Sequence, residues 1–560
     1  MILERLPARE YTCDVCIVGS GPVGMALALE LERLGRHVVV LESGGTNADP
    51  EGSEASRAVI VDPQRHAQME IAVCRALGGT SWTWGGRCVA LDSVDFETRS
   101  YVPHSGWPIG QDDIEPWYAK AAGYLRCGDA TFRSQPSHLG GLGAEVSAEF
   151  LERWSAEPRL ALVHRRPIER SQRITLFLNS TVTDLDFGGG GRVVESVLVA
   201  GSDGKSRVKA RDVILAAGGV ETTRLLLAVQ RRWPDHFGGT DGPLGRYYMG
   251  HISGKIASIV FDNPADIADF DFELDRSGTY VRRRFVVSAA AQQTHGLLNT
   301  AFFPDNPPFY DPRHRSSVLS AVFLALAIPP IGRRLVSEAI RIAHVGSKPY
   351  HLGAHLRNVL LGAPRGVQDL VKIVHGRFLA EPRKPAFLVR NRDGRYALHY
   401  HAEQEPNPDS RVVLTGEVDQ FGLPRVAIDL RFTQRDARSV VDSHQVLDAA
   451  LRGNRIGRLE YWYPIEQLPD RVLAQASDGL HQVGTTRMGQ DARNSVVDTD
   501  LKVHGVANLY VASSSVFPTT GQANSTYPAT ALAIRLAHHL NREAVGIEIQ
   551  KGRTVNHAPC

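Results

Sequence analysis

Cysteine is scarce in this sequence, with six residues among 560, and their spacing is irregular. Such a pattern provides neither the paired framework of a small secreted domain nor the spacing of a zinc site. Cys13 and Cys16 form a C-x-x-C at the beginning of an apolar segment, without the helix start that makes such thiols reactive. We therefore expect reduced thiols and no bound metal ion.

The sequence also lacks a charge excess of either sign and any long apolar run. Lysine and arginine number 63 and aspartate and glutamate 61, so no overall field favours nucleic acid as a partner. The longest candidate span, 318–331, contains Ser320, Pro329 and Pro330 and is shorter than the roughly 20 apolar residues that cross a bilayer. Charges near the amino terminus argue against a signal peptide, and we expect a cytoplasmic protein.

Residues 13–42 have the pattern of a dinucleotide-binding βαβ unit: a strand, a glycine-rich turn, a helix and a second strand that ends at Glu42. Gly19 permits the tight turn, Gly21 lets the backbone approach a pyrophosphate, and Gly24 allows the helix to pack closely on the strand. Glu42 suits a ribose 2′-hydroxyl and would repel a 2′-phosphate. The unit therefore favours FAD or NAD over NADP.

A second glycine turn follows later in the chain. The strand-like segment 212–217 runs into Gly218 and Gly219 and then into a helical segment, 221–227. A nicotinamide-dependent dehydrogenase would explain the first unit but would not require this second turn. Between about residues 255 and 475 the pattern alternates in short segments, which is typical of a largely antiparallel sheet beside helices. Because 560 residues exceed what one hydrophobic core usually organises, we expect two domains.

Two parts of the sequence resemble the glucose-methanol-choline (GMC) oxidoreductases. They are AAGGVET at 216–222 and the C-terminal run 481–536, which begins HQVGTTRMG and contains GQAN at 521–524. The resemblance is good over 12–260 and 475–541 and loose in between. No motif of a serine hydrolase, an H-E-x-x-H zinc protease or a P-loop NTPase competes with it.

The resemblance implies an α/β fold with two domains. A Rossmann-like FAD-binding domain of the GMC type would combine 1–255 with 475–560 and include a flavin-covering loop at about 75–110. The substrate-binding domain, 256–474, would contain an antiparallel β-sheet flanked by helices.

The resemblance also implies which residues carry the chemistry. His481 stands where the family has the histidine that faces the flavin, and Asn524 stands at the position of its histidine or asparagine partner. Flavin N5 would accept the hydride of an alcohol, and a histidine suits the base because it can take up a proton near neutral pH. Some relatives attach FAD through a histidine where this chain has Thr83, so we expect noncovalent FAD. His251 and His504 lack such motif support, and we interpret them as structural.

Further residues are assigned to the FAD site by the same resemblance. They come from the covering loop, the second glycine turn and the C-terminal blocks, and they are Gly79, Thr80, Trp84, Gly85, Gly86, Val182, Ala217, Gly218, Glu221, Ser513, Ser525 and Thr526. Ser525 replaces the usual proline of the family, and Ser513 replaces the aspartate of many members. Neither departure removes a catalytic group.

Residues 89–109 continue the covering loop in the manner of the bacterial sugar-oxidising members of the family. The resemblance therefore implies that a hydroxyl group of a sugar, glycoside or related polyol is oxidised. A sterol-like or other non-sugar alcohol is the alternative substrate, and cleavage of a cyanohydrin without net redox chemistry is the alternative reaction. Oxygen, a quinone and a protein all stay open as the electron acceptor.

A basic segment lies in the middle third of the chain. Residues 331–377 contain eight lysines and arginines but only two acids, Glu338 and Asp369, and apolar residues alternate with them. Two interpretations are open. One is a solvated helical face that covers the site, and the other is a weak contact of 318–377 with a membrane surface.

Overall fold

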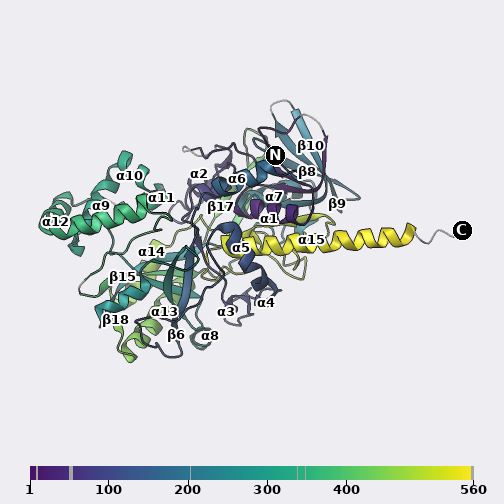
Figure 1. The fold of residues 1–560 in the computed structure, drawn as a ribbon. Helices are drawn as coiled ribbons and strands as arrows, with labels where there is room; N and C mark the ends of the chain where they lie inside the picture. The colour runs from purple at the N-terminus through teal and green to yellow at the C-terminus, as the bar shows by residue number, and fades with distance from the viewer. Residues whose placement is uncertain are drawn as a thin grey trace.

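The computed structural model describes residues 1–7, 10–49, 54–201, 204–336, 338–346, 348–391 and 393–555. Two large β-sheets form the body of the molecule, and a group of helices lies at one end of it (Figure 1). A long C-terminal helix, α15, runs along the first sheet and extends away from the body (Figure 1).

The first sheet is mostly parallel. Its strand order is β1-β7-β3-β2-β10-β9-β8, and β19 pairs with the end of β10. Only β8 and β9 run antiparallel to their neighbours in this sheet, as far as the structure describes it. The strands are β1 (Ile2–Leu3), β2 (Glu10–Val18), β3 (Val38–Leu41), β7 (Ile174–Phe177), β8 (Thr181–Gly188), β9 (Val193–Gly201), β10 (Gly204–Leu215) and β19 (Leu509–Val511). The pattern of Val and Ile on both faces of β2 and β3 is typical of parallel strands that helices cover.

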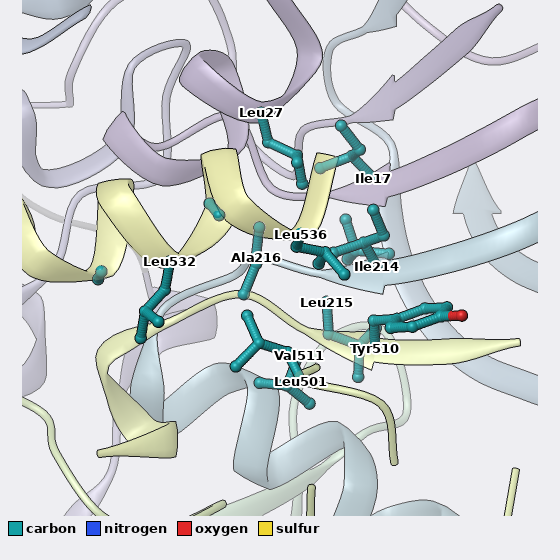
Figure 2. Close-up of a cluster of buried hydrophobic side chains, with 14 of the residues drawn as sticks. Ile17, Leu27, Ile214, Leu215, Ala216, Leu501, Tyr510, Val511, Leu532 and Leu536 are labelled. Atoms are coloured by element: carbon teal, nitrogen blue, oxygen red, sulfur yellow. The ribbon is translucent and has the colours of Figure 1, made fainter. Parts of the chain in front are cut away.

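Helices from both ends of the chain pack on this sheet. α1 (Pro22–Arg33) lies beside α15 (Thr526–Val555), and α5 (Tyr118–Leu125) contacts both. Figure 2 shows Leu27 of α1 and Ile17 of β2 packed with Leu536 of α15, next to Val511 of β19. The first and last segments of the chain therefore share one core. Two further helices of this half are α6 (Leu160–Arg170) and α7 (Gly219–Gln230).

The second sheet is antiparallel throughout, with the strand order β18-β11-β15-β14-β13-β6-β5 and β12 beside β13. Helices α13 (Gln434–Gly453) and α14 (Leu468–Gln475) cover one face of it. The strands are β5 (Arg87–Cys88), β6 (Val146–Trp154), β11 (His251–Phe261), β12 (Glu273–Leu274), β13 (Tyr280–Val287), β14 (Thr300–Asp305), β15 (Arg395–Glu403) and β18 (Gly457–Tyr461). The predicted fold class, a Rossmann-like domain and an antiparallel sheet flanked by helices, is confirmed.

Two details differ from the sequence interpretation. A single strand, β10, covers 204–215 where the sequence suggests two separate strands, at 208–210 and 212–217, because its first half extends the hairpin formed by β8 and β9. Strands β5 and β6 belong to the second sheet although they lie within the segment 1–255. The two domain boundaries stay a prediction.

The remaining elements are shorter or lie outside the two sheets. A small third sheet contains β4 (Val59–Ile60), β16 (Arg411–Val418) and β17 (Pro424–Asp429). The outer helices, as we call the group at the end of the molecule, are α9 (Ser317–Ala327), α10 (Pro329–Leu335), α11 (Glu338–Val345) and α12 (Leu352–Val374). Short helices are α2 (Met69–Ala72), α3 (Ser93–Phe96), α4 (Gln111–Ile114), α8 (Ala289–His295), the π-helical turn His375–Leu379 and the 3-10 turns Glu54–Ser56, Gly79–Trp82, Glu115–Trp117, His236–Gly238, Pro264–Phe270, Pro312–His314, Ile465–Gln467 and Ser514–Val516.

Among the described residues, no single helix has the length and hydropathy of a membrane span, whereas α9 and α10, bent by 111° at their junction, reach that length and composition together.

Candidate active site

A cavity of about 2150 Å³ lies between the first sheet and the second. Its wall combines the two glycine turns, the covering loop, one face of the antiparallel sheet and the inner sides of α9 and α12. His481 and Asn524 line the same cavity as the nucleotide-binding turns. One space therefore holds both the predicted cofactor site and the predicted catalytic pair.

The first glycine turn is shaped by close backbone contacts. Gly19 has φ +103°, and a Cβ there would lie 2.6 Å from the carbonyl oxygen of Ala216. A Cβ at Gly24 would lie 2.1 Å from the carbonyl oxygen of Gly19, so α1 packs on the turn as the sequence predicts. Gly21 has open space instead, with nothing within 4 Å of a Cβ, and it lines the cavity. Since Gly21 is the residue before α1, the free N–H groups of the helix start are available to a diphosphate.

Glu42 is fixed at the end of β3. Its carboxylate accepts hydrogen bonds from the backbone N–H and hydroxyl of Ser20, at 3.0 and 2.6 Å, and from the N–H of Gly44 at 2.8 Å. The side chain is buried yet lines the cavity beside the glycine turn. The position of this acid suits the ribose of a bound dinucleotide.

The covering loop packs on the nucleotide turn. Gly79 has φ +53°, and a Cβ there would lie 2.8 Å from the Cα of Gly21, which explains why glycine occupies the position. The indole N–H of Trp84 donates to the carbonyl oxygen of Pro158 at 2.6 Å and holds the end of the loop. Gly86 also has positive φ, +72°, but faces protein atoms rather than the cavity.

Sixteen of the eighteen predicted site residues line this cavity, and the other two, Gly24 and Gly86, shape the backbone next to it. Glu221 forms an ion pair with Arg75 at 2.8 Å, so the guanidinium of Arg75 compensates the charge of its carboxylate. Ser513 forms a hydrogen bond with the hydroxyl of Ser515 at 2.6 Å. The glycine turns, the helix start and Glu42 together fit the diphosphate and ribose of FAD. The remaining cavity-lining residues from the predicted set are Thr80, Gly85, Val182, Ala217, Gly218, Ser525 and Thr526.

His481 and Asn524, the predicted catalytic pair, lie side by side. The Nε2 atom of His481 lies 2.9 Å from the side-chain Nδ2 of Asn524. The Nδ1 atom of His481 lies 2.9 Å from a carboxylate oxygen of Asp478. Burial alone would raise the pKa of Asp478, but the charge of His481 and the hydrogen bond with it hold that pKa well below its usual range. Because Asp478 is ionised and can only accept, Nδ1 carries the proton and the lone pair of Nε2 faces Asn524.

Sequence reasoning missed Asp478, which organises the loop around His481. Its carboxylate also accepts backbone N–H bonds from His251 at 2.6 Å, Leu480 at 2.9 Å and His481 at 3.1 Å. The signal was present in the sequence as Asp-x-x-His, since an acid three residues before a histidine can reach its ring within one turn of the chain.

Two more histidines pack behind His481. The ring of His251 meets the ring of His481 edge to face at 4.6 Å and stacks on the ring of His401 at 4.4 Å. Burial lowers the pKa of His251 to about 3 and that of His401 well below the ordinary value, so both rings are neutral at physiological pH. His251, Asp478 and His481 bring three possible metal-ligand atoms within 4.8 Å of one another, and the hydrogen bonds of Asp478 already account for this closeness.

The antiparallel sheet supplies the opposite wall of the cavity. Lys255 on β11 forms an ion pair with Asp305 on β14 at 2.8 Å. Phe303 on β14 stacks with His399 on β15 at 4.6 Å, and the guanidinium of Arg282 lies 3.7 Å from the centre of the Phe303 ring. These residues line the cavity and come from four different strands, and no sequence motif identifies them.

The buried neutral histidine predicts a pH dependence of stability. The pKa of His251 is about 3 in the folded chain and about 6.5 in the unfolded chain, so between these values only the unfolded chain binds the proton. The contribution of neutral His251 to the free energy of unfolding is fully present above pH 6.5. It is lost as pH falls, by about 2 kcal/mol between pH 6.5 and 5. Urea unfolding of His251→Phe should therefore show a pH dependence that is weaker by this amount.

The exposed His138→Gln variant is the matched control and should keep the pH dependence of the wild type. If His251→Phe also keeps it, His251 is not the group that loses its proton on folding.

Comparison with known proteins places the chain in a family. The model described as "GMC oxidoreductase" matches residues 406–533, and the one described as "FAD binding domain" matches residues 12–70. The chain is 37% identical over 571 residues to the C-glycoside 3-oxidase of Arthrobacter globiformis, covering 96% of each protein. It is 21% identical to the fructose dehydrogenase large subunit of Gluconobacter japonicus, covering 94% of this chain and 97% of that protein.

Solved structures support the same fold. The formate oxidase of Aspergillus oryzae RIB40 has a TM-score of 0.52 at 15% sequence identity, with 95% of this chain and 98% of that chain covered. A fungal aryl-alcohol oxidase has a TM-score of 0.51 at 14% identity, with 95% and 99% covered. With a relative at 37% identity across nearly its whole length, this chain belongs to the GMC oxidoreductases and is an FAD-dependent oxidoreductase.

Proposed function

We propose that this chain oxidises a hydroxyl-bearing carbon of a sugar, glycoside or related polyol, with His481 as the base. The observation that carries the proposal is the His481 and Asn524 pair, 2.9 Å apart, in the cavity that also contains the nucleotide-binding turns. The 37% identity to a C-glycoside 3-oxidase supports the substrate class. FAD, when bound, supplies the hydride acceptor for the reaction.

The proton of the substrate hydroxyl goes to Nε2 of His481. Asp478 holds the imidazole in the tautomer in which Nε2 carries no proton, and its negative charge stabilises the imidazolium that forms. The Nδ2 group of Asn524 can donate to the substrate oxygen and fix its position. The Oδ1 atom of Asn524 is buried and has no hydrogen-bond partner among the described residues, so a second polar group of the substrate can donate to it.

The cavity walls favour a substrate with a polar part and an apolar part. Lys255, Asp305 and His399 present charged and polar groups that suit sugar hydroxyls. On the side of the outer helices, Val322 of α9 and Ile373 of α12 line the cavity with apolar atoms. We propose that the sugar ring lies on the sheet side and the remainder of a glycoside lies against the helices.

FAD is held noncovalently in this proposal because Thr83 offers no imidazole for a flavin link. Precipitation of the purified protein with acid should therefore leave the yellow chromophore in the supernatant. A yellow pellet after repeated washing would contradict the proposal and would direct attention to another nucleophile in the covering loop.

The two residues that control the proton should have separable effects on flavin reduction. His481→Ala removes the base and should slow reduction by substrate about 10² to 10⁴-fold with FAD still bound. Asp478→Asn removes the acceptor that fixes the tautomer and should slow reduction about 10 to 10³-fold, with recovery in Asp478→Glu. Anaerobic stopped-flow absorbance of the bound flavin measures both rates.

His504→Ala changes a histidine outside the cavity and serves as the control. Its bound flavin should be reduced by substrate at the wild-type rate. Reduction of the His481→Ala protein at that same rate would show that another group is the base. Full activity of Asp478→Asn would show that the carboxylate has only a structural role.

The substrate class is tested by mixing the anaerobic protein with free sugars, O- and C-glycosides, polyols and non-sugar alcohols. Bleaching of the flavin band by glycosides at rates at least ten-fold above those for simple alcohols is the expected result. Preferential bleaching by a sterol-like or other non-sugar alcohol would reject the proposed class. A flavin that dithionite reduces but no alcohol bleaches would favour a reaction without net oxidation. Admitting air to the bleached sample then tests oxygen as the acceptor.

A further inference from the structure

Helix α12 presents its apolar side chains to solvent. Leu352, Leu356, Leu360, Val367 and Val371 have exposed fractions of 49, 53, 77, 60 and 62%. At about 100° per residue they fall within an arc of roughly 100° on one side of the helix. We call these five residues the α12 stripe. A helix of a water-soluble domain normally turns such a stripe towards its own core.

The opposite side of α12 is small and polar, and this side packs on the protein. A Cβ at Gly362 would lie 2.7 Å from the side chain of Ser317, so α9 and α12 approach closely there. Within the same contact, the buried His355 and the half-buried Asn358 each lie 3.1 Å from the hydroxyl of Ser320. The polarity of α12 is therefore reversed, with polar groups inside and leucine and valine outside.

Other outer helices also expose apolar residues. Ile328 and Ile331, at the junction of α9 and α10, are 49 and 46% exposed, and Ile342 of α11 is 53% exposed. Figure 1 shows these helices gathered at one end of the molecule, apart from both sheets. An apolar surface of this kind marks an interaction site.

The positive charge of the outer helices indicates which kind of partner this surface binds. Residues 331–377 contain eight basic and two acidic residues, and one of the acids, Glu338, is bound by Arg341 at 2.8 Å. Arg357 is exposed on α12 about 40° beyond the edge of the stripe, and Lys372 is exposed about 100° beyond the same edge. A second copy of the same surface would bring two positive regions together, whereas anionic lipid headgroups complement them.

We propose that the α12 stripe docks on an anionic lipid surface, with the stripe at the level of the acyl chains and Arg357 among the headgroups. Apolar and basic residues in this arrangement are typical of helices that lie in the plane of a membrane interface. The last turns of the same helix contribute Ile373 to the cavity wall. Docking therefore brings one wall of the active-site cavity next to the lipid.

Vesicle flotation of the FAD-loaded protein tests this proposal. The probes are vesicles of phosphatidylcholine alone and of phosphatidylcholine with an equal part of phosphatidylglycerol. The bound fraction should be at least ten-fold higher on the anionic vesicles and should fall when NaCl is raised from 0.05 to 0.5 M. The double variant Leu360→Asp/Val367→Asp should lower it at least ten-fold.

Val418→Asp is the matched control, because Val418 is 58% exposed on β16 and lies outside the outer helices. It should float like the wild type. Neither Leu360 nor Val367 lines the cavity, so flavin absorbance and turnover without vesicles should be unchanged in the double variant. Turnover thus reports on the proposed function separately from the lipid contact.

Absence of flotation with anionic vesicles, or equal flotation of the double variant, would overturn the proposal. Light scattering supplies the remaining outcome: a dimeric wild type that becomes monomeric in the double variant, without lipid binding, would assign the stripe to a contact between two copies.

Discussion

The pairing of β10 with strands from both ends of the chain determines where the active site forms. Leu215 of β10 lies opposite Val18 of β2 on one side and Val511 of β19 on the other. Since all three strands are parallel, the glycine turn after β2, the turn after β10 and the segment after β19 emerge at the same edge of the sheet. Packing of α15 on α1 then fixes Asn524, which precedes α15, beside this edge.

Local features of the site could be predicted from the sequence, because each depends on a few adjacent residues. The positive φ of Gly19 and the close approach at Gly24 follow from the glycine pattern alone. The proximity of His481 and Asn524 could be predicted only from the family resemblance, because 43 residues separate them and no spacing rule brings them together. Asp478 could have been found by asking which group orients the ring of His481.

The wall of the cavity that the antiparallel sheet supplies could not be predicted from the sequence, because strand register creates it. His399 lies opposite Phe303 on one neighbouring strand and opposite Lys255 on the other, although the three residues span about 150 positions. The orientation of α12 could not be predicted from the sequence either. Its helical period identifies one apolar side and one polar side, and the usual rule would bury the apolar one. Only the contacts of Gly362 and His355 with α9 show that the rule is reversed here.

Burial of Asp478 explains why His481 and its surroundings form one unit. A carboxylate out of water must be matched by donors, and three backbone N–H groups together with the ring of His481 provide them. The neutral rings of His251 and His401 add no charge behind the base. In the proposed reaction, the positive charge that forms on His481 therefore meets an anion that is already in place, so little reorganisation is required. The same arrangement that makes the buried carboxylate stable also suits the imidazole to the role of base that we propose for it.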